Sequence, residues 1–298
     1  MNARIDGCPC ERNTHSEPVH RGRNGNCNAR VADDGLPFQC VGAWARDKHN
    51  YLRRYLDATR GARARYIPPH GTGGAAFIDL FAGPGFACDQ TSSKLIEGSP
   101  LIALNHTGAP FTSVILCELE SDNINALEKR TIGHEPRVHI VAGDCNAQIL
   151  RVLFLIPDHG LNIALVDPFR PSDLVWETLR NLGTVNRMDL IIHFPTMAIK
   201  RNFAKAGFYD IIDRAIGTSS WRSQVQTAND VPKLIDFLKQ SLAGVGYTGN
   251  KVRSLAIKNT VQGVLYHMVF AAKHPLGDRI WQSIARTTPA GERELDLF

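Results

Sequence analysis

The chain has 298 residues, of which 43% are hydrophobic and 21% are charged. This balance is typical of folded globular proteins and excludes wholesale disorder. No apolar run approaches the roughly 18 residues of a membrane span, so the sequence predicts no transmembrane helix. The first residues lack the apolar core of a signal peptide, and we therefore expect a cytoplasmic protein.

The positive charge is concentrated in one segment. Lys and Arg outnumber Asp and Glu by 34 to 29, and residues 46–65 supply this whole excess. Arg46, Arg53 and Arg60 stand seven residues apart, which places them on one face of a helix. Such a face is typical of contact with an anionic partner, and we expect RNA or DNA to bind there. A solvated helix face and a protein partner are the alternatives, and no membrane partner is expected.

The chain begins with a predicted flexible tail over residues 1–39, where apolar residues are isolated and follow no period. Residues 40–298 are expected to form one domain. Its first element is a helix that ends near Gly61. One face of this helix is apolar and is formed by Trp44, Tyr51, Leu52, Tyr55 and Leu56.

Five short apolar runs follow, and such runs are typical of strands buried on both faces of a parallel sheet. They are Ala75–Leu80, Val114–Cys117, Val138–Ala142, Ile163–Val166 and Leu190–Phe194. Helices are expected between them at Ser99–His106, Asp122–Arg130 and Ser172–Leu182, and Phe86–Gly98 is expected to be a loop. A helical insertion over about residues 198–245 and an antiparallel hairpin, Val252–Ile257 with Leu265–Ala272, complete the chain. The alternation predicts a doubly wound α/β fold.

The ends of the first four strands carry the candidate functional residues. The first strand runs into Asp79-Leu80-Phe81-Ala82-Gly83-Pro84-Gly85, whose glycines let the backbone approach a ligand closely. The next three strands end at Glu118, Asp144 and Asp167. Because the carboxyl ends of parallel strands meet at one sheet edge, these residues predict a crevice for a nucleoside. We expect Glu118 to bind the ribose hydroxyls and Asp144 to bind an adenine amine.

A dinucleotide-binding dehydrogenase is the competing interpretation. Its fingerprint needs three glycines at the start of a helix and an acid about 20 residues later. Here Gly85 precedes the expected loop, and Glu118 lies 35 residues after Gly83. No helix start is placed to hold a pyrophosphate. S-adenosylmethionine carries no phosphate, so the pattern favours this cofactor and a methyltransferase.

Several motifs occur in an order that carries a family resemblance. They are Val41-Gly42-x-Trp44, Lys48-His49, Asp79-x-Phe81-Ala82-Gly83-Pro84-Gly85, Gly98-Ser99-Pro100, Gly143-Asp144-x-Asn146 and Asp167-Pro168-Phe169. This order, from about Val41 to Trp281, resembles the three-Cys-motif partner protein family (TcmP), a branch of the class I, Rossmann-like methyltransferases. The resemblance implies a mostly parallel, seven-stranded sheet with a reversed last strand. It also implies S-adenosylmethionine binding at Asp79, Gly83, Gly85, Glu118 and Asp144, to which we add Lys48, Phe81, Ala82, Pro84 and Cys145.

The fourth strand end bears on the acceptor. Methyltransferases of exocyclic base amines carry Asp/Asn-Pro-Pro-aromatic there, with the acid on the amine and the aromatic ring on the flipped base. This chain has Asp167-Pro168-Phe169, so the second proline is absent and the aromatic residue comes one place early. We expect these three residues to be catalytic and a nucleic-acid base to be the acceptor. An Asp167 that only caps the turn, a small-molecule methyltransferase and a non-catalytic cofactor-binding partner protein remain alternatives.

Lys48 falls in the middle of the apolar face of the first helix. A lysine in that position must snorkel outward, form an ion pair or contact a ligand. We expect it to bind the cofactor carboxylate or a substrate phosphate. His49 is expected at the surface. His193, in the fifth strand run, is expected to be a core histidine with its polar atoms satisfied, and a side chain that reaches the crevice is the alternative.

The seven cysteines are dispersed and odd in number, which argues against a disulfide framework. Cys8, Cys10 and Cys27, with His15 and His20 between them, lack the paired short spacings of zinc sites, so no metal is expected. Cys117 and Cys145 follow apolar runs and are expected to be small core residues.

Overall fold

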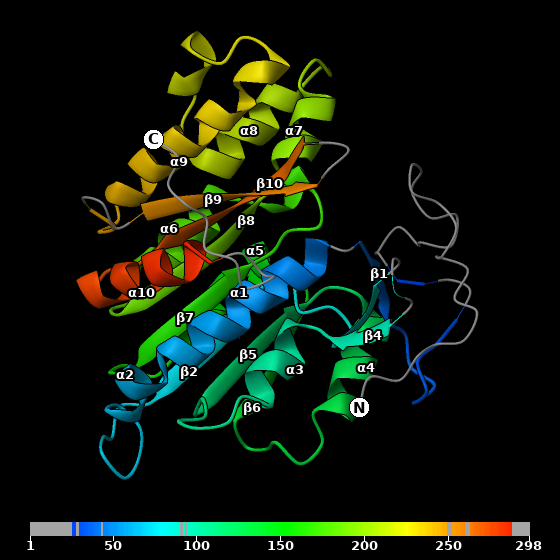
Figure 1. Ribbon diagram of the computed structural model, residues 1–298, viewed down its shortest axis with the longest axis vertical. Helices are drawn as coiled ribbons and strands as arrows, with labels where there is room; N and C mark the ends of the chain where they lie inside the picture. Colours follow the sequence, from blue (N-terminus) through cyan, green and yellow to red (C-terminus); the bar gives the residue numbers. More distant parts are fainter. Residues whose placement is uncertain are drawn as a thin grey trace.

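The computed structural model describes residues 26–27, 30–42, 44–89, 92, 94–248, 252–259 and 263–287. A seven-stranded sheet with the order β6-β5-β2-β7-β8-β10-β9 lies at its centre (Figure 1). The strands are β2 (Ala75–Asp79), β5 (Ser113–Glu118), β6 (Val138–Ala142), β7 (Leu161–Val166), β8 (Met188–Phe194), β9 (Val252–Asn259) and β10 (Gly263–Ala271). The first five strands are parallel, and β10 runs against both β8 and β9. The predicted fold class is therefore confirmed.

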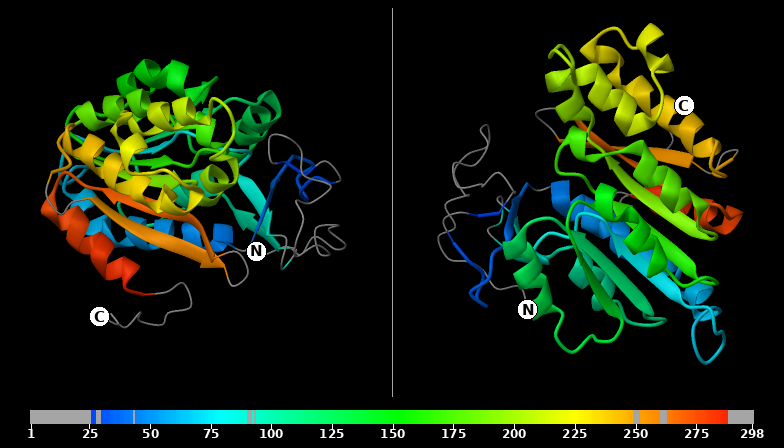
Figure 2. Two further views of the ribbon diagram at one scale, coloured as in Figure 1. Left: turned by 90° about the horizontal axis from the view of Figure 1, so that it is seen from above. Right: turned by 180° about the vertical axis from the view of Figure 1, so that it is seen from behind.

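Helices cover both faces of this sheet, as the view from above shows (Figure 2). One face packs against α1 (Trp44–Ala58), α3 (Ser99–Leu104), α4 (Ser121–Arg130) and α10 (Pro275–Ala285). The other face packs against α5 (Cys145–Phe154), α6 (Trp176–Thr184), α8 (Phe208–Ile216) and α9 (Leu234–Ala243). Successive residues of β2 enter the two cores in turn, Ala75 and Phe77 on one face and Ala76 and Ile78 on the other.

A second, three-stranded sheet stands beside the carboxyl edge of the main one. Its order is β1-β3-β4, with β1 at Gln39–Val41, β3 at Phe86–Asp89 and β4 at Lys94–Glu97. The prediction of a loop over Phe86–Gly98 is therefore wrong. These short strands satisfy their backbone groups only because β1, which precedes α1 in the chain, pairs with β3.

A small apolar cluster packs on this second sheet and contains Cys27, Ala32, Phe38, Cys40 and Cys88. Within the described residues, packing thus begins ahead of residue 39, where the sequence places the end of the tail. Residues 1–25 of that tail lie outside the described part of the chain.

The first helix is shorter than predicted. α1 ends at Ala58, and α2 (Arg60–Ala64) is a separate short helix. Trp44, predicted on the apolar face, keeps 41% of its surface exposed. The predicted helical insertion contains α7 (Thr196–Asn202), α8 and α9, joined by turns of 3-10 helix at Ser220–Ser223 and Ala228–Lys233.

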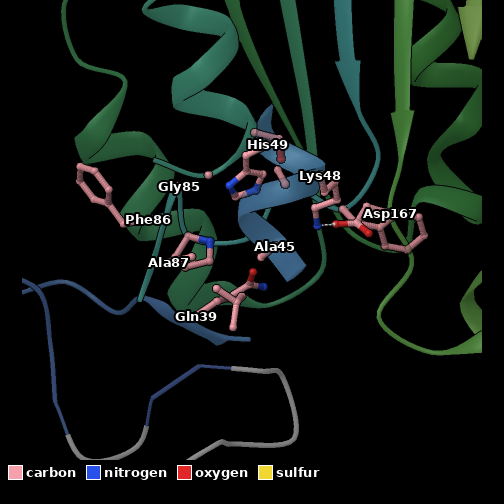
Figure 3. A pocket seen from close by; sticks show the side chains of 14 residues that line it. Gln39, Ala45, Lys48, His49, Gly85, Phe86, Ala87 and Asp167 are labelled. Atoms are coloured by element: carbon pink, nitrogen blue, oxygen red, sulfur yellow. Dashed lines mark hydrogen bonds and ion pairs between the residues drawn. The ribbon is translucent and has the colours of Figure 1, made fainter. Parts of the chain in front are cut away.

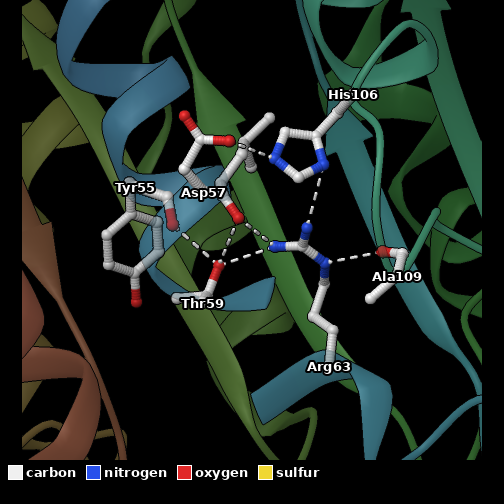
Figure 4. Close-up of polar contacts among 7 residues, drawn as sticks. Tyr55, Asp57, Thr59, Arg63, His106 and Ala109 are labelled. Atoms are coloured by element: carbon white, nitrogen blue, oxygen red, sulfur yellow. Dashed lines mark hydrogen bonds and ion pairs between the residues drawn. The ribbon is translucent and has the colours of Figure 1, made fainter. Parts of the chain in front are cut away.

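A fully buried arginine holds the junction between α1 and α2 (Figure 4). Arg63 donates to the carbonyl oxygens of Leu56 and Ala109 at 2.7 and 3.2 Å and to the Thr59 hydroxyl at 2.6 Å. Its Nη2 lies 3.2 Å from Nδ1 of His106. Burial lowers the pKa of Arg63 to about 10, so the guanidinium is still charged at neutral pH. These contacts fix the end of α1 and therefore the position of the helix beside the sheet.

Candidate functional site

A pocket lies where β2 and β7 end, next to α1 (Figure 3). It contains about 370 Å³ of empty space, part of it open to solvent. Its lining comes from five segments: β1, α1, the turn after β2 with β3, the start of α3, and the end of β7. The residues are Gln39, Val41, Ala45, Lys48, His49, Phe81, Ala82, Pro84, Gly85, Phe86, Ala87, Gly98, Ser99 and Asp167. The helical insertion contributes none of these described lining residues.

The turn after β2 has the backbone that the glycines predict. Gly83 and Gly85 have φ angles of 63° and 93°, in the left-handed region that other residues avoid. The amide of Gly83 donates to Oε2 of Glu118 at 2.7 Å. Oε1 of Glu118 accepts from the amides of Leu119 and Glu120 at 2.8 and 2.9 Å. Glu118 therefore stabilises the glycine turn, and only Oε2 retains a lone pair for a ribose hydroxyl.

Asp79, at the end of β2, is fully buried. Its Oδ1 accepts from the amide of Phe81 at 3.2 Å, while its Oδ2 has no hydrogen-bond partner among the described residues. Burial raises the pKa of Asp79 to about 7, against the lowering effect of the Ser99 hydroxyl and the Phe81 amide. An unsatisfied carboxyl oxygen at this depth is a group that a ligand can satisfy.

An ion pair crosses the pocket. Lys48 of α1 donates to Oδ2 of Asp167 at the end of β7, and both side chains are less than one-fifth exposed. His193, near the end of β8, places Nδ1 2.9 Å from Oδ1 of the same carboxylate. Burial alone would raise the pKa of Asp167, but the charge of Lys48 and the contact with His193 lower it well below its usual range. The lysine on the apolar helix face is thus explained by pairing.

Two histidines differ from the sequence prediction. His49, expected at the surface, is 5% exposed and lines the pocket, because the unpredicted second sheet encloses this side of α1. Burial, together with the charges of Lys48 and Arg53, lowers its pKa to about 3, so the ring is neutral. His193, expected in the core, belongs to the site. The signal for His193 was its position on β8, one residue beyond the pairing of Ile192 with Val166 of β7.

Seven predicted site residues are not among those that line the pocket: Asp79, Gly83, Glu118, Asp144, Cys145, Pro168 and Phe169. Asp144 caps α5 by accepting from the amide of Asn146 at 2.9 Å, and Cys145 behind it is buried. Pro168 is buried, whereas Phe169 leaves the strand end with 45% of its surface exposed. The structure therefore brings the glycine turn, Lys48 and Asp167 together at one pocket, and it leaves Asp144, Cys145, Pro168 and Phe169 outside the lining.

The three arginines that were predicted to share one helix face lie on two helices. Arg46 pairs with Asp89 of β3, and Arg53 pairs with Glu97 of β4 at 3.2 Å. Arg60 belongs to α2, so its predicted place on the same helix face is wrong, because the helix is interrupted at Thr59.

Among the described residues, no three His, Cys, Asp or Glu side chains are arranged to hold a metal ion. Four of the five residues of the zinc alternative, Cys8, Cys10, His15 and His20, lie outside the described part of the chain. None of the described helices has the length and apolar character to cross a membrane.

Comparison with solved structures gives distant likenesses. Protein LPL1258 from Legionella pneumophila has a TM-score of 0.49 and 14% identity, over 84% of this chain and 94% of that one. TYW2 from M. jannaschii, solved with AdoMet, has a TM-score of 0.40 and 12% identity, over 84% and 86% of the two chains. The Methanococcus jannaschii fibrillarin pre-rRNA processing protein has a TM-score of 0.38 and 12% identity, over 67% and 66%.

No family model matches the sequence, and no curated protein matches it significantly. Because the identities and TM-scores of the solved structures are low, the fold is established by the strand order of this chain itself.

Asp79 gives stability a defined pH dependence. Its pKa rises from 3.8 in the unfolded chain to about 7 in the native state, which therefore binds the proton more tightly. The resulting stabilisation is full below about pH 4 and is lost as the pH rises toward 7. Relative to Asp79→Asn, we expect the free energy of unfolding of the wild type to fall by up to about 1.4 kcal/mol per pH unit in that window.

Urea unfolding at half-unit pH steps measures this difference. Asp158→Asn, which removes an exposed carboxyl group, is the control for the loss of one titrating side chain. A wild-type-minus-Asp79→Asn difference that stays constant from pH 4 to 8 would contradict a raised pKa.

Proposed function

We propose that this protein is an S-adenosylmethionine-dependent methyltransferase. The observation that carries the proposal is the meeting of three groups at one edge of the class I sheet: the left-handed glycine turn, the unsatisfied oxygen of Asp79 and the cation of Lys48. The cofactor has an amino-acid end with both an ammonium and a carboxylate group. Lys48 on one side and Asp79 on the other are complementary to those two charges.

The donor set also fits a cofactor without phosphate. Glu118 keeps one lone pair beside the glycine turn for a ribose hydroxyl. When bound, the cofactor supplies an activated methyl group on a sulfonium. The protein's own part is then to position the acceptor and exclude water.

Asp167 is suited to orient the acceptor. Its lowered pKa keeps it ionised, so it accepts hydrogen bonds rather than protons near neutral pH. Lys48 and His193 fix the carboxylate from two sides. Phe169, two residues further on, offers an exposed aromatic ring. A flipped base is bound in this way when its amine donates to a carboxylate such as Asp167 and its ring stacks on an aromatic side chain such as Phe169.

We accordingly propose a nucleic-acid base as the acceptor. The helical insertion contributes no residue to the described pocket lining. This supports a nucleic-acid acceptor, because a large acceptor needs a pocket entrance that is not covered. Arg46 and Arg53 are 46% and 45% exposed and provide cations for phosphates, although each must then share its charge with Asp89 or Glu97. Arg60 would contribute from α2. The motif order further supports membership of the three-Cys-motif partner family.

Cofactor binding is the first test. We expect calorimetry to show binding of S-adenosylhomocysteine, the demethylated product of the cofactor, and no binding of NAD. Gly83→Val should abolish the binding, because a side chain there fills the close approach to the turn. Gly133→Val is the matched control: Gly133 also has a positive φ, of 87°, but lies in a loop with open space around it. Binding of NAD in place of the homocysteine compound would overturn the proposal.

Methyl transfer is the second test. We expect label from methyl-tritiated S-adenosylmethionine to enter total cellular RNA or DNA, and Asp167→Asn to reduce the incorporation about a hundredfold because the acceptor is no longer oriented. Asp173→Asn, a carboxylate of the turn after β7 that does not line the pocket, should retain most of it. If label enters only small molecules or only protein, the proposed nucleic-acid acceptor is wrong. Cofactor binding without label in any fraction would indicate a binding protein.

A further inference from the structure

A segment that precedes the first helix lies against the glycine turn. We call residues 30–41 the strap. Gln39, near its end, faces Gly83 so closely that a Cβ atom added to that glycine would lie 3.0–3.2 Å from the carboxamide atoms. Gln39 and Val41 also line the pocket, and Figure 3 shows Gln39 beside Ala45. The strap is thus one wall of the pocket.

One arginine holds both the strap and the glycine turn. Arg130, at the end of α4, forms a two-pronged ion pair with Asp34 of the strap at 2.8 and 2.9 Å. Its Nη1 donates to the carbonyl of Pro37 at 2.8 Å and to the carbonyl of Pro84 at 2.5 Å. The side chain is only 4% exposed, and two-pronged guanidinium–carboxylate pairs are the strongest and most directional of their kind.

Further contacts keep the strap in register. Cys40 and Val41 pair with Cys88 and Asp89 of β3. Just before the strap, Asn26 donates to the side chain of Asn123 on α4 at 2.6 Å. The strap is therefore attached to α4 and to the second sheet, the two elements that flank the turn.

From this arrangement we propose that Gln39 is a further cofactor-binding residue, and that Arg130 is a positioning residue that holds it there. The inference rests on the proposed function. The Gly83 amide is bonded to Glu118, and the Gln39 carboxamide faces the same glycine. A carboxamide both donates and accepts, and so does each hydroxyl of a ribose. Gln39 and Glu118 together bind the ribose of an adenine nucleoside.

The strap also limits access. Because Gln39 and Val41 form a wall of the pocket, a nucleoside enters or leaves most easily when the strap moves away from the turn. Weakening the Arg130–Asp34 pair therefore speeds both association and dissociation. Removing the carboxamide has a different effect, since it speeds dissociation and leaves association unchanged.

The test measures S-adenosylhomocysteine binding by calorimetry and stopped-flow fluorescence. Gln39→Leu keeps the size of the side chain and should weaken affinity about tenfold, the effect of one or two lost hydrogen bonds. Asp34→Asn should raise both rate constants several-fold, and the dissociation rate constant more than the association rate constant, so that affinity also falls. Gln240→Leu, on the exposed face of α9, is the control for the first change and should bind like the wild type.

The double variant separates positioning from mere stability. If Arg130 and Asp34 act by holding Gln39, the loss in Asp34→Asn/Gln39→Leu is smaller than the product of the two single losses. Independent, multiplying losses would overturn the positioning role of the Arg130–Asp34 pair. Wild-type affinity in Gln39→Leu would overturn the inference while leaving the methyltransferase proposal intact. A wild type that binds no S-adenosylhomocysteine would overturn both.

Discussion

The ion pair between Lys48 and Asp167 is the interaction on which the site depends. It joins two elements that are 119 residues apart in the sequence, the first helix and the end of the fourth parallel strand. Neither charge is well solvated, and a single buried charge without its partner costs several kcal/mol. The pair therefore fixes α1 against the carboxyl edge of the sheet. The glycine turn, His49 and the strap are all placed relative to that helix.

The two carboxyl groups of the site, Asp167 and Asp79, differ in their pKa values. Asp167 is held ionised by Lys48 and His193, whereas burial brings the pKa of Asp79 to about 7. One acid is thus a permanent acceptor of hydrogen bonds, and the other can hold a proton at neutral pH. Neighbouring acids with separated pKa values are common in active sites, where each takes one role. In the proposed reaction, Asp167 faces the acceptor, and Asp79 faces the amino-acid end of the cofactor.

The sheet and the glycine turn were predictable from the sequence because both are local patterns. Buried parallel strands are short apolar runs, and the turn needs glycine at two positions where φ is positive. The strand-end acids followed from the fold class. Their detailed roles could not be predicted. Glu118, for example, accepts hydrogen bonds from three backbone amides, which occupy three of its four lone-pair sites. No residue pattern shows which backbone groups will face a carboxylate.

The second sheet was not predictable, and most of the other errors follow from it. β1 and β3 are short and lie on opposite sides of α1 and β2 in the sequence, so neither is a recognisable strand alone. Once they pair, they enclose His49, which a helical wheel places at the border of the apolar face. The break between α1 and α2 was hidden for a different reason. Thr59 interrupts the helix without glycine or proline, through its hydroxyl bonds to the carbonyls of Tyr55 and Leu56 and its contact with the buried Arg63.

A double-mutant cycle on Lys48→Met and Asp167→Asn tests the central pair most directly, with the free energy of unfolding as the measured quantity. Each single change leaves one charge or dipole without its partner and should destabilise the protein by about 1–3 kcal/mol. The double variant should be little worse than the milder single one, giving a coupling energy of at least about 1 kcal/mol. Two losses that simply add would contradict the account, because the two side chains would then contribute to stability independently.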